Sequence, residues 1–407
     1  MYRIALIADN HFVYDQEGRY YISGTYTKQY LERFTRNFDE VVIIGRGHSA
    51  ISEEETEKLS ETGGDKVFFE ILPDFHGIKK YILLRNSLKK RIKEVLEGVD
   101  AVFVRMPCIL TTISISIAKK ANMPIMVDVG ADPGKTYLSS KPSLSEKLIS
   151  KYLSNVCRTT CAGANGVSYV TEKALQREYP CKAIVEGESP LYFSVSLSNV
   201  DISDAFYYSH RQYVKKQVWS FIHVSNSICK SSGKGHIECL RVIADLVRRG
   251  CDASITFVGG GNGQNELLEI AHDLGIEERL SFTGRVDRAY IRSLYLSHDI
   301  FLFPSYTEGL PRVIIEAMST GLICIASNVG GIPELLEERD IFEYDDITGM
   351  SERIIHLISN DKEMNEVSSN NYNKSLMYSN TNLRSICDNY HDKVKLCIDE
   401  YRKSNDY

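Results

Sequence analysis

The feature that most constrains the fold is a regular alternation along the chain. Short apolar runs rich in β-branched residues alternate with amphipathic stretches of roughly 10–20 residues. This pattern is typical of βα units, whose strands form parallel sheets. The runs fall into two sets, separated by the Ser-, Tyr- and Asp-rich segment Glu186–Gln217, which has no sustained periodicity. The sequence therefore predicts an α/β protein with two parallel-sheet domains.

The predicted strands can be given by their ranges. In the first half they are Arg3–Ala8, Glu40–Gly45, Val67–Leu72, Ala101–Arg105, Ile125–Val129, Val167–Thr171 and Ala183–Val185. In the second half they are Ser220–Ser225, Ser254–Val258, Leu280–Thr283, Ile300–Pro304 and Leu322–Ser327. The Asn/Ser-rich run Ser368–Asn382 weakens a helix assignment there, and helical periodicity returns in Leu383–Tyr401.

The length supports the same division, because a chain of 407 residues is too long for one ordinary hydrophobic core and fits two domains of about 150–200 residues each. We expect an N-terminal Rossmann-like domain over 1–187, a connection over 188–217 and a C-terminal Rossmann-like domain over 218–375. The segment 376–407 is expected to be helical and to pack back on the N-terminal domain.

Composition excludes several classes of protein. The 48 Lys and Arg against 54 Asp and Glu give a net charge of −6, which argues against a broad nucleic-acid binder. No apolar run reaches the roughly 18–20 residues of a membrane span, and the first strand is too short for a signal peptide. The ten cysteines are scattered without metal-ligand spacing, which favours reduced thiols in a cytoplasmic protein.

The most informative stretch is 301–338, which reads FLFPSYTEGLPRVIIEAMSTGLICIASNVGGIPELLEE. A strand leads into a loop with Glu308, and a helix begins with Pro311 at its first position, where a missing N–H costs nothing. The free N–H groups of such a helix start favour an anion such as a phosphate. In a purely structural interpretation, Glu308 complements the helix dipole and Glu316 is solvated.

The surrounding motifs add a resemblance to a known family. The two glutamates stand in EGLPRVIIEAM, followed by IASNVGGIPEL and preceded by FVGGGNG (257–263), LSFTGRV (280–286) and the pair Lys234-Gly235. This block resembles the retaining nucleotide-sugar glycosyltransferases of family GT4. The resemblance is strong over 219–338 and weaker in the N-terminal half. There, VRMPC (104–108) and GVSYVTEKAL (166–175) look like segments of bacterial surface-polysaccharide glycosyltransferases.

The resemblance implies a GT-B fold, in which an acceptor domain and a donor domain face a central cleft. It also implies that Glu316 holds the ribose hydroxyls of the nucleotide and that Glu308 holds hydroxyls of the donor sugar, as carboxylate acceptors can. The other donor-binding positions that it implies or suggests are Gly24, Lys230, Gly259, Arg285, Val286, Gly309, Leu310 and Arg312. The base is expected beside Arg285 and Val286.

The diphosphate of the donor needs positive charge, because electrons move onto it as the sugar departs. Lys234 matches the lysine that the family uses for this task. The family's arginine is missing, since VSNSICKSSGKG places Asn226 near that position, and Lys230 is the candidate replacement. The family also commonly has glycine where Pro311 stands, so one N–H donor is lost. The run at Gly259 is not a dinucleotide fingerprint and predicts a tight turn near the phosphates or simple packing.

A catalytic base is not evident. Many relatives place a histidine after the fifth N-terminal strand, where this chain reads VDVGADPG. Asp132 is the candidate for positioning the acceptor or sugar, although it could equally hold a turn. A retaining reaction on one face can use the leaving phosphate oxygen to assist deprotonation of the acceptor. Because no D-x-D sequence occurs, we expect no metal and no cofactor beyond the nucleotide-sugar co-substrate.

One segment suggests a membrane contact. Lys79–Lys93 carries seven cationic residues and no acid, with an apolar stripe at helical spacing. This pattern is that of an ordinary surface helix or of an interfacial helix near anionic lipid. The second interpretation would place a cytoplasmic enzyme on the inner face of the membrane, where a lipid-linked acceptor lies.

The sequence thus predicts a retaining glycosyltransferase that moves a sugar from a nucleotide diphosphate, with UDP favoured by family frequency. The acceptor is expected to be a polysaccharide or a lipid-linked glycan. Two alternatives keep the fold: a nucleotide-sugar epimerase and a non-catalytic nucleotide-sugar-binding subunit. A nicotinamide dehydrogenase is disfavoured, because no dinucleotide fingerprint opens either half.

Overall fold

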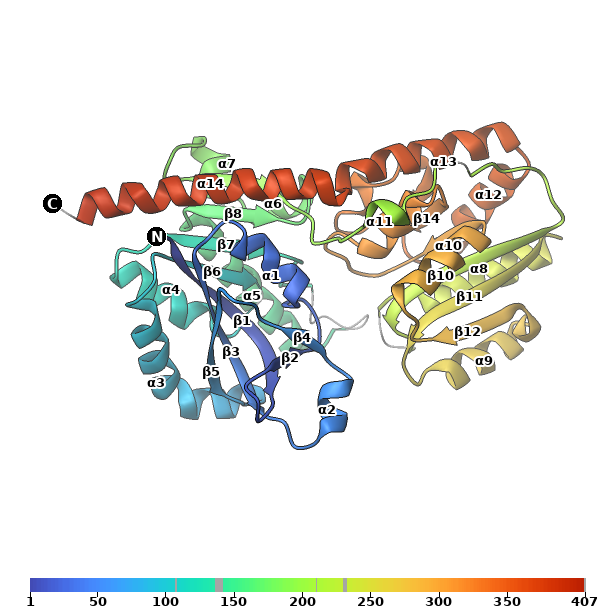
Figure 1. The fold of residues 1–407 in the computed structure, drawn as a ribbon. Helices are drawn as coiled ribbons and strands as arrows, with labels where there is room; N and C mark the ends of the chain where they lie inside the picture. Colours follow the sequence, from blue (N-terminus) through green and yellow to red (C-terminus); the bar gives the residue numbers. More distant parts are fainter. Residues whose placement is uncertain (107, 136–141, 210, 230–232, 406–407) are drawn as a thin grey trace.

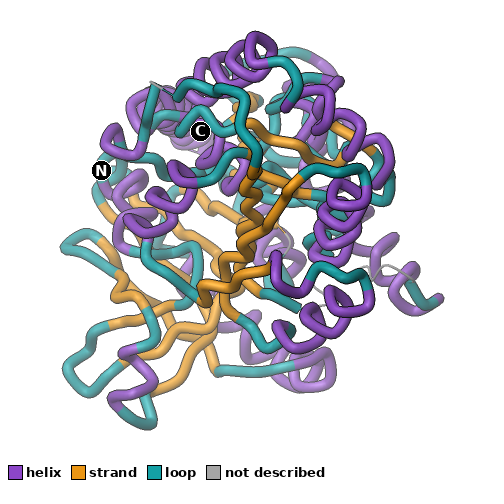
Figure 2. The backbone as a smooth tube through the Cα atoms, turned by 90° about the vertical axis from the view of Figure 1, so that its right-hand side faces the viewer, coloured by secondary structure: helices purple, strands orange, loops and turns teal. Residues whose placement is uncertain are grey.

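The computed structural model describes residues 1–106, 108–135, 142–209, 211–229 and 233–405. Two α/β domains lie side by side, each with helices packed against a mainly parallel sheet (Figure 1). In the view of Figure 2, helices lie on both sides of the strands of the C-terminal domain. These features confirm the predicted fold class of two Rossmann-like domains.

The N-terminal sheet has the parallel order β5-β3-β1-β6-β7-β8-β9, with β2 and β4 continuing antiparallel from the end of β1. Its strands are β1 (Arg3–Tyr14), β2 (Tyr20–Ile22), β3 (Glu40–Ser49), β4 (Ser60–Thr62), β5 (Val67–Pro73), β6 (Ala101–Met106), β7 (Ile125–Val129), β8 (Gly166–Tyr169) and β9 (Phe193–Ser196). The helices are α1 (Lys28–Thr35), α2 (Glu53–Glu57), α3 (Gly77–Leu96), α4 (Thr111–Lys120), α5 (Leu144–Ala162), α6 (Ala174–Glu178) and α7 (Lys182–Glu186).

The C-terminal sheet has the parallel order β12-β11-β10-β13-β14-β15. Its strands are β10 (Val218–Ser227), β11 (Asp252–Gly260), β12 (Leu280–Gly284), β13 (Ile300–Phe303), β14 (Ile323–Ser327) and β15 (Ile341–Phe342). The helices are α8 (His236–Arg248), α9 (Gln264–Asp273), α10 (Arg288–Ser297), α11 (Arg312–Ser319), α12 (Ile347–Ile358), α13 (Asp361–Ser375) and α14 (Asn380–Asn405), with short 3-10 turns η1 (Asp204–Phe206), η2 (Glu277–Arg279), η3 (Ile332–Glu334), η4 (Glu338–Asp340) and η5 (Leu376–Tyr378).

Two sequence-based assignments are wrong. Ala183–Val185 lies in helix α7 rather than in a strand, because a three-residue apolar run cannot distinguish the two. The last strand of this sheet is instead β9, inside the segment expected to be the connection. The run Ser368–Asn382 begins within helix α13, where Ser368 and Asn371 donate hydrogen bonds to the carbonyls of Gly321 and Leu322. These tertiary contacts outweigh the low helix propensity of the run.

Helix α14 crosses from the C-terminal domain and lies along the N-terminal domain (Figure 1). Its buried residues Tyr390 and Val394 belong to the same apolar cluster as β1 and α1. Asp388 also pairs with Arg36 at 2.7 Å. The last helix therefore connects the two domains by a second route.

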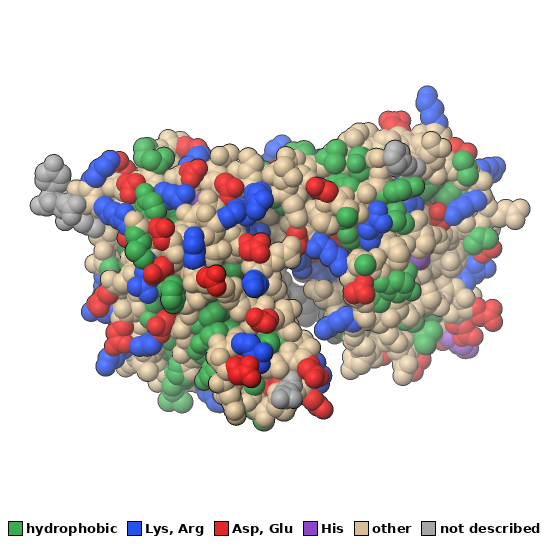
Figure 3. Space-filling view, viewed as in Figure 1, with side chains coloured by type: hydrophobic (Ala, Val, Ile, Leu, Met, Phe, Trp, Pro, Cys, Tyr) green, Lys and Arg blue, Asp and Glu red, His purple; other side chains and the backbone are tan. Residues whose placement is uncertain are grey.

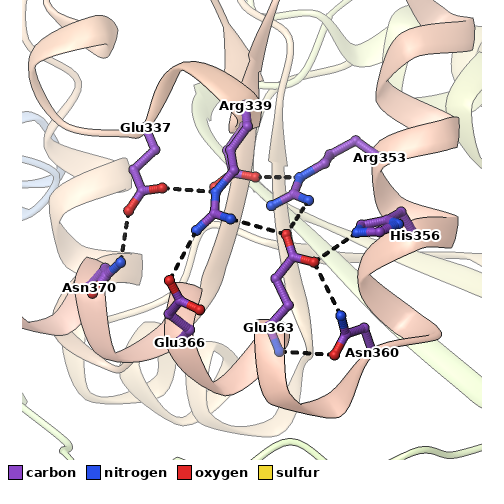
Figure 4. Close-up of polar contacts among 9 residues, drawn as sticks. Glu337, Arg339, Arg353, His356, Asn360, Glu363, Glu366 and Asn370 are labelled. Carbon is purple, nitrogen blue, oxygen red and sulfur yellow. Dashed lines mark hydrogen bonds and ion pairs between the residues drawn. The ribbon is translucent and has the colours of Figure 1, made fainter.

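A network of ionic contacts joins η4, α12 and α13 behind the C-terminal sheet (Figure 4). The Arg353 guanidinium, only 10% exposed, bonds Asp340 at 2.8 Å and Glu363 at 2.5 Å. Arg339 reaches the same Glu363 at 3.2 Å but is 38% exposed. Burial raises the pKa of Asp340, and the Arg353 guanidinium opposes that shift. Arg353 is thus the principal counter-charge of a buried carboxylate.

Candidate active site

The strand order locates the site. In the C-terminal sheet, β10 and β13 are neighbours. The chain continues from β10 to β11 on one side of this pair and from β13 to β14 on the other side. Loops that follow such a pair of strands diverge and leave a crevice at their carboxyl ends, where ligands of open α/β sheets bind. The loop after β10 carries Lys234, and the loop after β13 carries Glu308. Two residues that the sequence singled out separately are therefore brought to one point of the fold.

Lys234 and Glu308 are in direct contact. Lys234 Nζ lies 2.7 Å from Glu308 Oε1, and the Ser305 hydroxyl donates to the same oxygen at 2.8 Å. The Glu308 side chain is 9% exposed and that of Lys234 is 34% exposed. The lysine is therefore the more exposed partner and can contact an incoming anion, while the Ser305 hydroxyl and Lys234 hold the buried glutamate.

Glycines allow the loops to approach each other closely. Gly235 precedes α8 with φ of 76°, and a Cβ there would lie 2.0 Å from the carbonyl oxygen of Pro304. Gly259 has φ of 148°, and a Cβ would lie 2.0 Å from the carbonyl oxygen of Ser225. Any side chain at either position would force the loops apart. Gly259 thus has a packing reason, alongside its predicted place near phosphates.

Helix α11 begins one residue later than expected, with Pro311 as its N-cap rather than its first helical residue. Within the described part of the chain, the N–H groups of Gly309 and Leu310 make no backbone hydrogen bond. These groups and the start of α11 lie in the same loop as Glu308, and the N–H groups of a helix start favour an anion. The cradle for sugar and diphosphate stays a prediction.

Glu316 lies one turn into α11 and is not a solvated side chain. Burial raises the pKa of Glu316, while Arg288 and Arg312 oppose the shift. The Tyr295 hydroxyl donates to Glu316 Oε2 only at a long 3.5 Å. The carboxylate oxygens of Glu316 can therefore still accept hydrogen bonds in a partly buried position. Binding of two vicinal hydroxyls requires such acceptors.

The predicted base-binding residues lie beside the glycine loop. The Arg285 side chain is exposed, and its Nε would be 3.6 Å from a Cβ placed on Gly260. Val286 is partly buried against the main apolar cluster. Arg312 is exposed at the first position of α11. These positions surround the strand ends at which a nucleotide would lie.

The two domains meet directly at this site, although in the view of Figure 3 a hollow with Lys and Arg side chains on its rim separates part of their surfaces. A Cβ on Gly309 would lie 2.6 Å from the carbonyl oxygen of Gly130, in the loop after β7. The Glu334 carboxylate accepts hydrogen bonds from the N–H groups of Glu172, Lys173 and Ala174 at 2.5, 2.8 and 2.7 Å. The motifs GVSYVTEKAL and GGIPEL thus form an interdomain contact, and Glu334 is a residue that sequence reasoning missed.

The remaining candidates differ in their surroundings. Gly24 is exposed with φ of 117°, and the nearest atom to an added Cβ would be Asn10 Nδ2 at 3.8 Å. Asp132 is 12% exposed and accepts from the Tyr179 hydroxyl and, at 3.0 Å, from the Gly134 N–H. These bonds favour the turn-holding role of Asp132. Lys230 lies outside the described residues.

Arg105 is a second residue that the sequence analysis did not single out. It lies 3.2 Å from Asp128 and 3.1 Å from the Tyr30 hydroxyl, and the charge of Asp128 helps to raise its pKa. A Cβ on Gly130 would lie 3.0 Å from the guanidinium, so Arg105 supports the loop that touches Gly309. Its strand position gave no signal, because buried arginines resemble surface ones in sequence.

Comparison with known proteins gives consistent results. Residues 215–374 match the family model described as glycosyl transferases group 1. The chain is 25% identical to protein CapJ of Staphylococcus aureus over 340 residues, covering 82% of this chain and 81% of CapJ. It is 35% identical over 127 residues to the UDP-Gal:alpha-D-GlcNAc-diphosphoundecaprenol alpha-1,3-galactosyltransferase of Escherichia coli, covering 30% and 32% of the two chains.

Solved structures show the same fold. Sucrose-phosphate synthase from Thermosynechococcus elongatus superposes with a TM-score of 0.64 at 15% identity, over 95% of this chain and 96% of that one. HepE of Anabaena, solved in complex with UDP, superposes with a TM-score of 0.61 at 16% identity over the whole of both chains.

The fold is that of the GT-B glycosyltransferases, and the family match and the relatives identify the protein as a glycosyltransferase. More particularly, residues 215–374 are a glycosyltransferase group 1 domain, of the GT4-like kind that the motifs indicated. The predicted family resemblance and the predicted class of enzyme are confirmed.

Proposed function

We propose that this enzyme transfers a sugar, with retention of anomeric configuration, from a UDP-sugar to a polysaccharide or lipid-linked glycan. The observation that carries the proposal is the contact between Lys234 and Glu308 at the start of α11, with Glu316 one turn further on. Together these residues supply a cation for the diphosphate, an acid for the sugar and an acid for the ribose of a nucleotide sugar.

The chemistry assigned to these residues is electrostatic. As the bond between the anomeric carbon and the diphosphate breaks, negative charge grows on the phosphate oxygen. Lys234, once it turns from Glu308 to the donor, and the N–H groups of Gly309 and Leu310 can stabilise that charge. A histidine base is absent from the Gly130–Gly134 region, so the departing phosphate oxygen takes the acceptor proton on the same face. This route predicts retention.

Support for the donor and acceptor comes from proteins that this chain resembles. HepE is described in complex with UDP, and the Escherichia coli relative uses UDP-Gal and a diphosphoundecaprenol-linked sugar. A lipid-linked acceptor would require the enzyme to reach a membrane surface. No helix in the described residues is long and apolar enough to cross a bilayer.

The structure offers a surface for such contact on α3 and α5, which we call the α3/α5 patch. Tyr152 of α5 is close enough to Tyr81 of α3 to add to the effect of burial in raising the pKa of Tyr81. The exposed apolar residues of the patch are Ile82, Leu83, Leu144, Leu148, Ile149 and Tyr152. Exposed lysines and arginines flank them, namely Lys79, Lys80, Arg85, Lys147 and Lys151. Apolar side chains ringed by cations fit an anionic lipid surface.

Substitution of this patch should weaken membrane binding. Leu83 is 82% exposed and Leu148 is 70% exposed, so Leu83→Ser combined with Leu148→Ser should not disturb the core. We expect the double variant to bind anionic vesicles several-fold less tightly than the wild type, with unchanged UDP affinity. Leu396→Ser, at a 59% exposed position of α14, is the matched control. If the wild-type protein does not bind anionic vesicles at low salt, where electrostatic attraction is least screened, the proposed membrane contact is wrong.

Transfer should not depend on a divalent metal at the donor. The chain has no D-x-D sequence, and a lysine with a helix N-terminus can neutralise the diphosphate. We therefore expect initial rates in excess EDTA to stay within about twofold of the untreated rate, a change of well under 1 kcal/mol in barrier. Abolition of transfer by EDTA, with recovery on adding Mg²⁺ or Mn²⁺, would contradict this prediction.

The proposal as a whole is tested by product analysis. The enzyme is incubated with a panel of nucleotide sugars, first alone and then with a lipid-linked acceptor, and the products are followed by NMR. We expect nucleotide release that depends on the acceptor and a product with the donor's anomeric configuration. Conversion of the sugar without an acceptor would indicate an epimerase, and donor binding without any turnover would indicate a non-catalytic subunit.

A further inference from the structure

A cluster of imidazoles and carboxylates lies in the N-terminal domain, outside the donor site. His11 lies on β1, His48 on β3, and Asp74 and His76 follow β5. These strands are neighbours in the sheet, and Val13 pairs with His48 while Gly47 pairs with Pro73. His11 and His48 therefore project from the same face of adjacent strands, and Asp74 continues the register beside His48. Strand pairing, rather than a flexible loop, brings these side chains together.

Three of these residues can share one ion. One nitrogen of His11, one oxygen of Asp74 and one nitrogen of His76 all lie within 4.8 Å of one another. His11 Nδ1 lies 2.5 Å from Asp74 Oδ1, and His76 Nε2 lies 3.8 Å from Asp74 Oδ2. Ligands bonded to a tetrahedral Zn²⁺ at about 2.0–2.1 Å are about 3.3 Å apart. The observed separations of 2.5 and 3.8 Å lie on either side of that spacing.

Two of the three side chains already lie against each other. The imidazoles of His11 and His76 stack at 4.6 Å between centroids with an interplanar angle of 4°. Because an imidazole lone pair lies in the plane of its ring, a shared ion requires one ring to turn out of this stack, and the His76 side chain, which is 77% exposed, has room to do so. The side chains of His11 and Asp74 are only 32% and 20% exposed, so they are held in place.

An outer layer of contacts orients the carboxylate. His48 Nδ1 lies 3.4 Å from Asp74 Oδ2, and its Nε2 lies 2.9 Å from Glu55 Oε1. Glu55 is itself fixed by the N–H of Ile51 at 3.0 Å. Carboxylate–histidine chains of this kind commonly orient the first ligands of protein metal sites.

We propose that His11, Asp74 and His76 form a binding site for a divalent transition cation of the Zn²⁺ class. Imidazole nitrogens with one carboxylate suit Zn²⁺ better than Mg²⁺ or Ca²⁺, which prefer oxygen ligands. Three protein ligands leave a coordination position for water or an anion. The ion would join β1 to the start of α3, because Gly77 opens that helix directly after His76. His48 and Glu55 act as positioning residues.

The test is a direct measurement of metal binding by the full-length protein. Chelator-treated and dialysed wild type is titrated with Zn²⁺ by calorimetry, and bound zinc is counted by elemental analysis after gel filtration. We expect one Zn²⁺ per chain and a rise in melting temperature with zinc concentration, as mass action requires. Binding only at millimolar Zn²⁺, or no binding, would overturn the proposal.

Variants locate the ion. His76→Ala changes a side chain that is 77% exposed, so it should fold normally and lose the bound zinc. Asp74→Asn should also lose it, and His48→Gln should weaken affinity about 10–100-fold, the range for outer-shell partners. His272→Ala is the matched control, since that imidazole is 73% exposed and lies 3.9 Å from both Asp273 and Glu277. Equal zinc content in His76→Ala and His272→Ala would refute the site.

Discussion

Replacing Lys234 by alanine should reduce kcat roughly 100-fold, more than it raises the KM for the donor. The lysine Nζ now contacts Glu308 at 2.7 Å and is the more exposed partner of the pair. It can therefore move to the diphosphate. There its positive charge stabilises the leaving group most strongly in the transition state, because negative charge has then developed on the phosphate oxygen. Loss of one donor to the charge that develops in the transition state commonly costs about 10²–10³-fold in kcat. Steady-state kinetics with the best donor measure both parameters.

Two controls separate chemistry from folding in this variant. Lys403→Ala removes a lysine that is 70% exposed on the last helix and should have wild-type kinetics. The melting temperature of Lys234→Ala should fall less than that of Arg353→Ala, because Lys234 is 34% exposed and Ser305 still donates to Glu308. Unchanged kinetics in Lys234→Ala would make this lysine an ordinary residue at a helix start.

Replacing Arg353 by alanine should destabilise the protein by about 3–5 kcal/mol, the usual cost of removing one partner of a buried ion pair. Asp340, whose side chain is 2% exposed, would lose the guanidinium at 2.8 Å that compensates its buried charge. Glu363 would lose its contact with the same group. Chemical denaturation, followed by a signal from the C-terminal domain such as Trp219 fluorescence, measures the loss.

The neighbouring arginine supplies the comparison. Arg339→Ala removes contacts to Glu337, Glu363 and Glu366 from a side chain that is 38% exposed. Solvent screens such pairs, so the cost should stay below about 1 kcal/mol. Similar losses in both variants would show that burial of Asp340 does not set the energy of this network.

The sequence predicted the architecture well because parallel strands buried on both faces appear as continuous apolar runs. The strands from Ile125 to Val129 and from Leu280 onward lie where the pattern placed them. What it missed are elements whose stability comes from distant partners. Strand β9 is short and partly polar, and it forms by pairing with β8. Helix α13 is stabilised by side-chain bonds to Gly321 and Leu322.

The site was predicted in part for a similar reason. Lys234, Glu308 and Glu316 stand in motifs tied to strand ends, so the sequence could associate them before their contacts were known. Glu334 contacts residues at least 160 positions away, and Arg105 contacts Asp128 on a neighbouring strand. No local sequence pattern predicts such contacts. The histidine cluster likewise depends on strand register, because His11 and Asp74 are 63 residues apart.

The central claim is that Glu316 holds the nucleotide and Glu308 holds the sugar. The most direct test is calorimetric titration of UDP into wild type, Glu316→Gln and Glu308→Gln. Because the ribose does not react, Glu316→Gln should weaken UDP binding by about 1.5–3 kcal/mol, the value of a charged hydrogen bond. Glu308→Gln should leave UDP affinity nearly unchanged while lowering turnover of the UDP-sugar. Equal loss of UDP affinity in both variants, or no loss in either, would contradict the account.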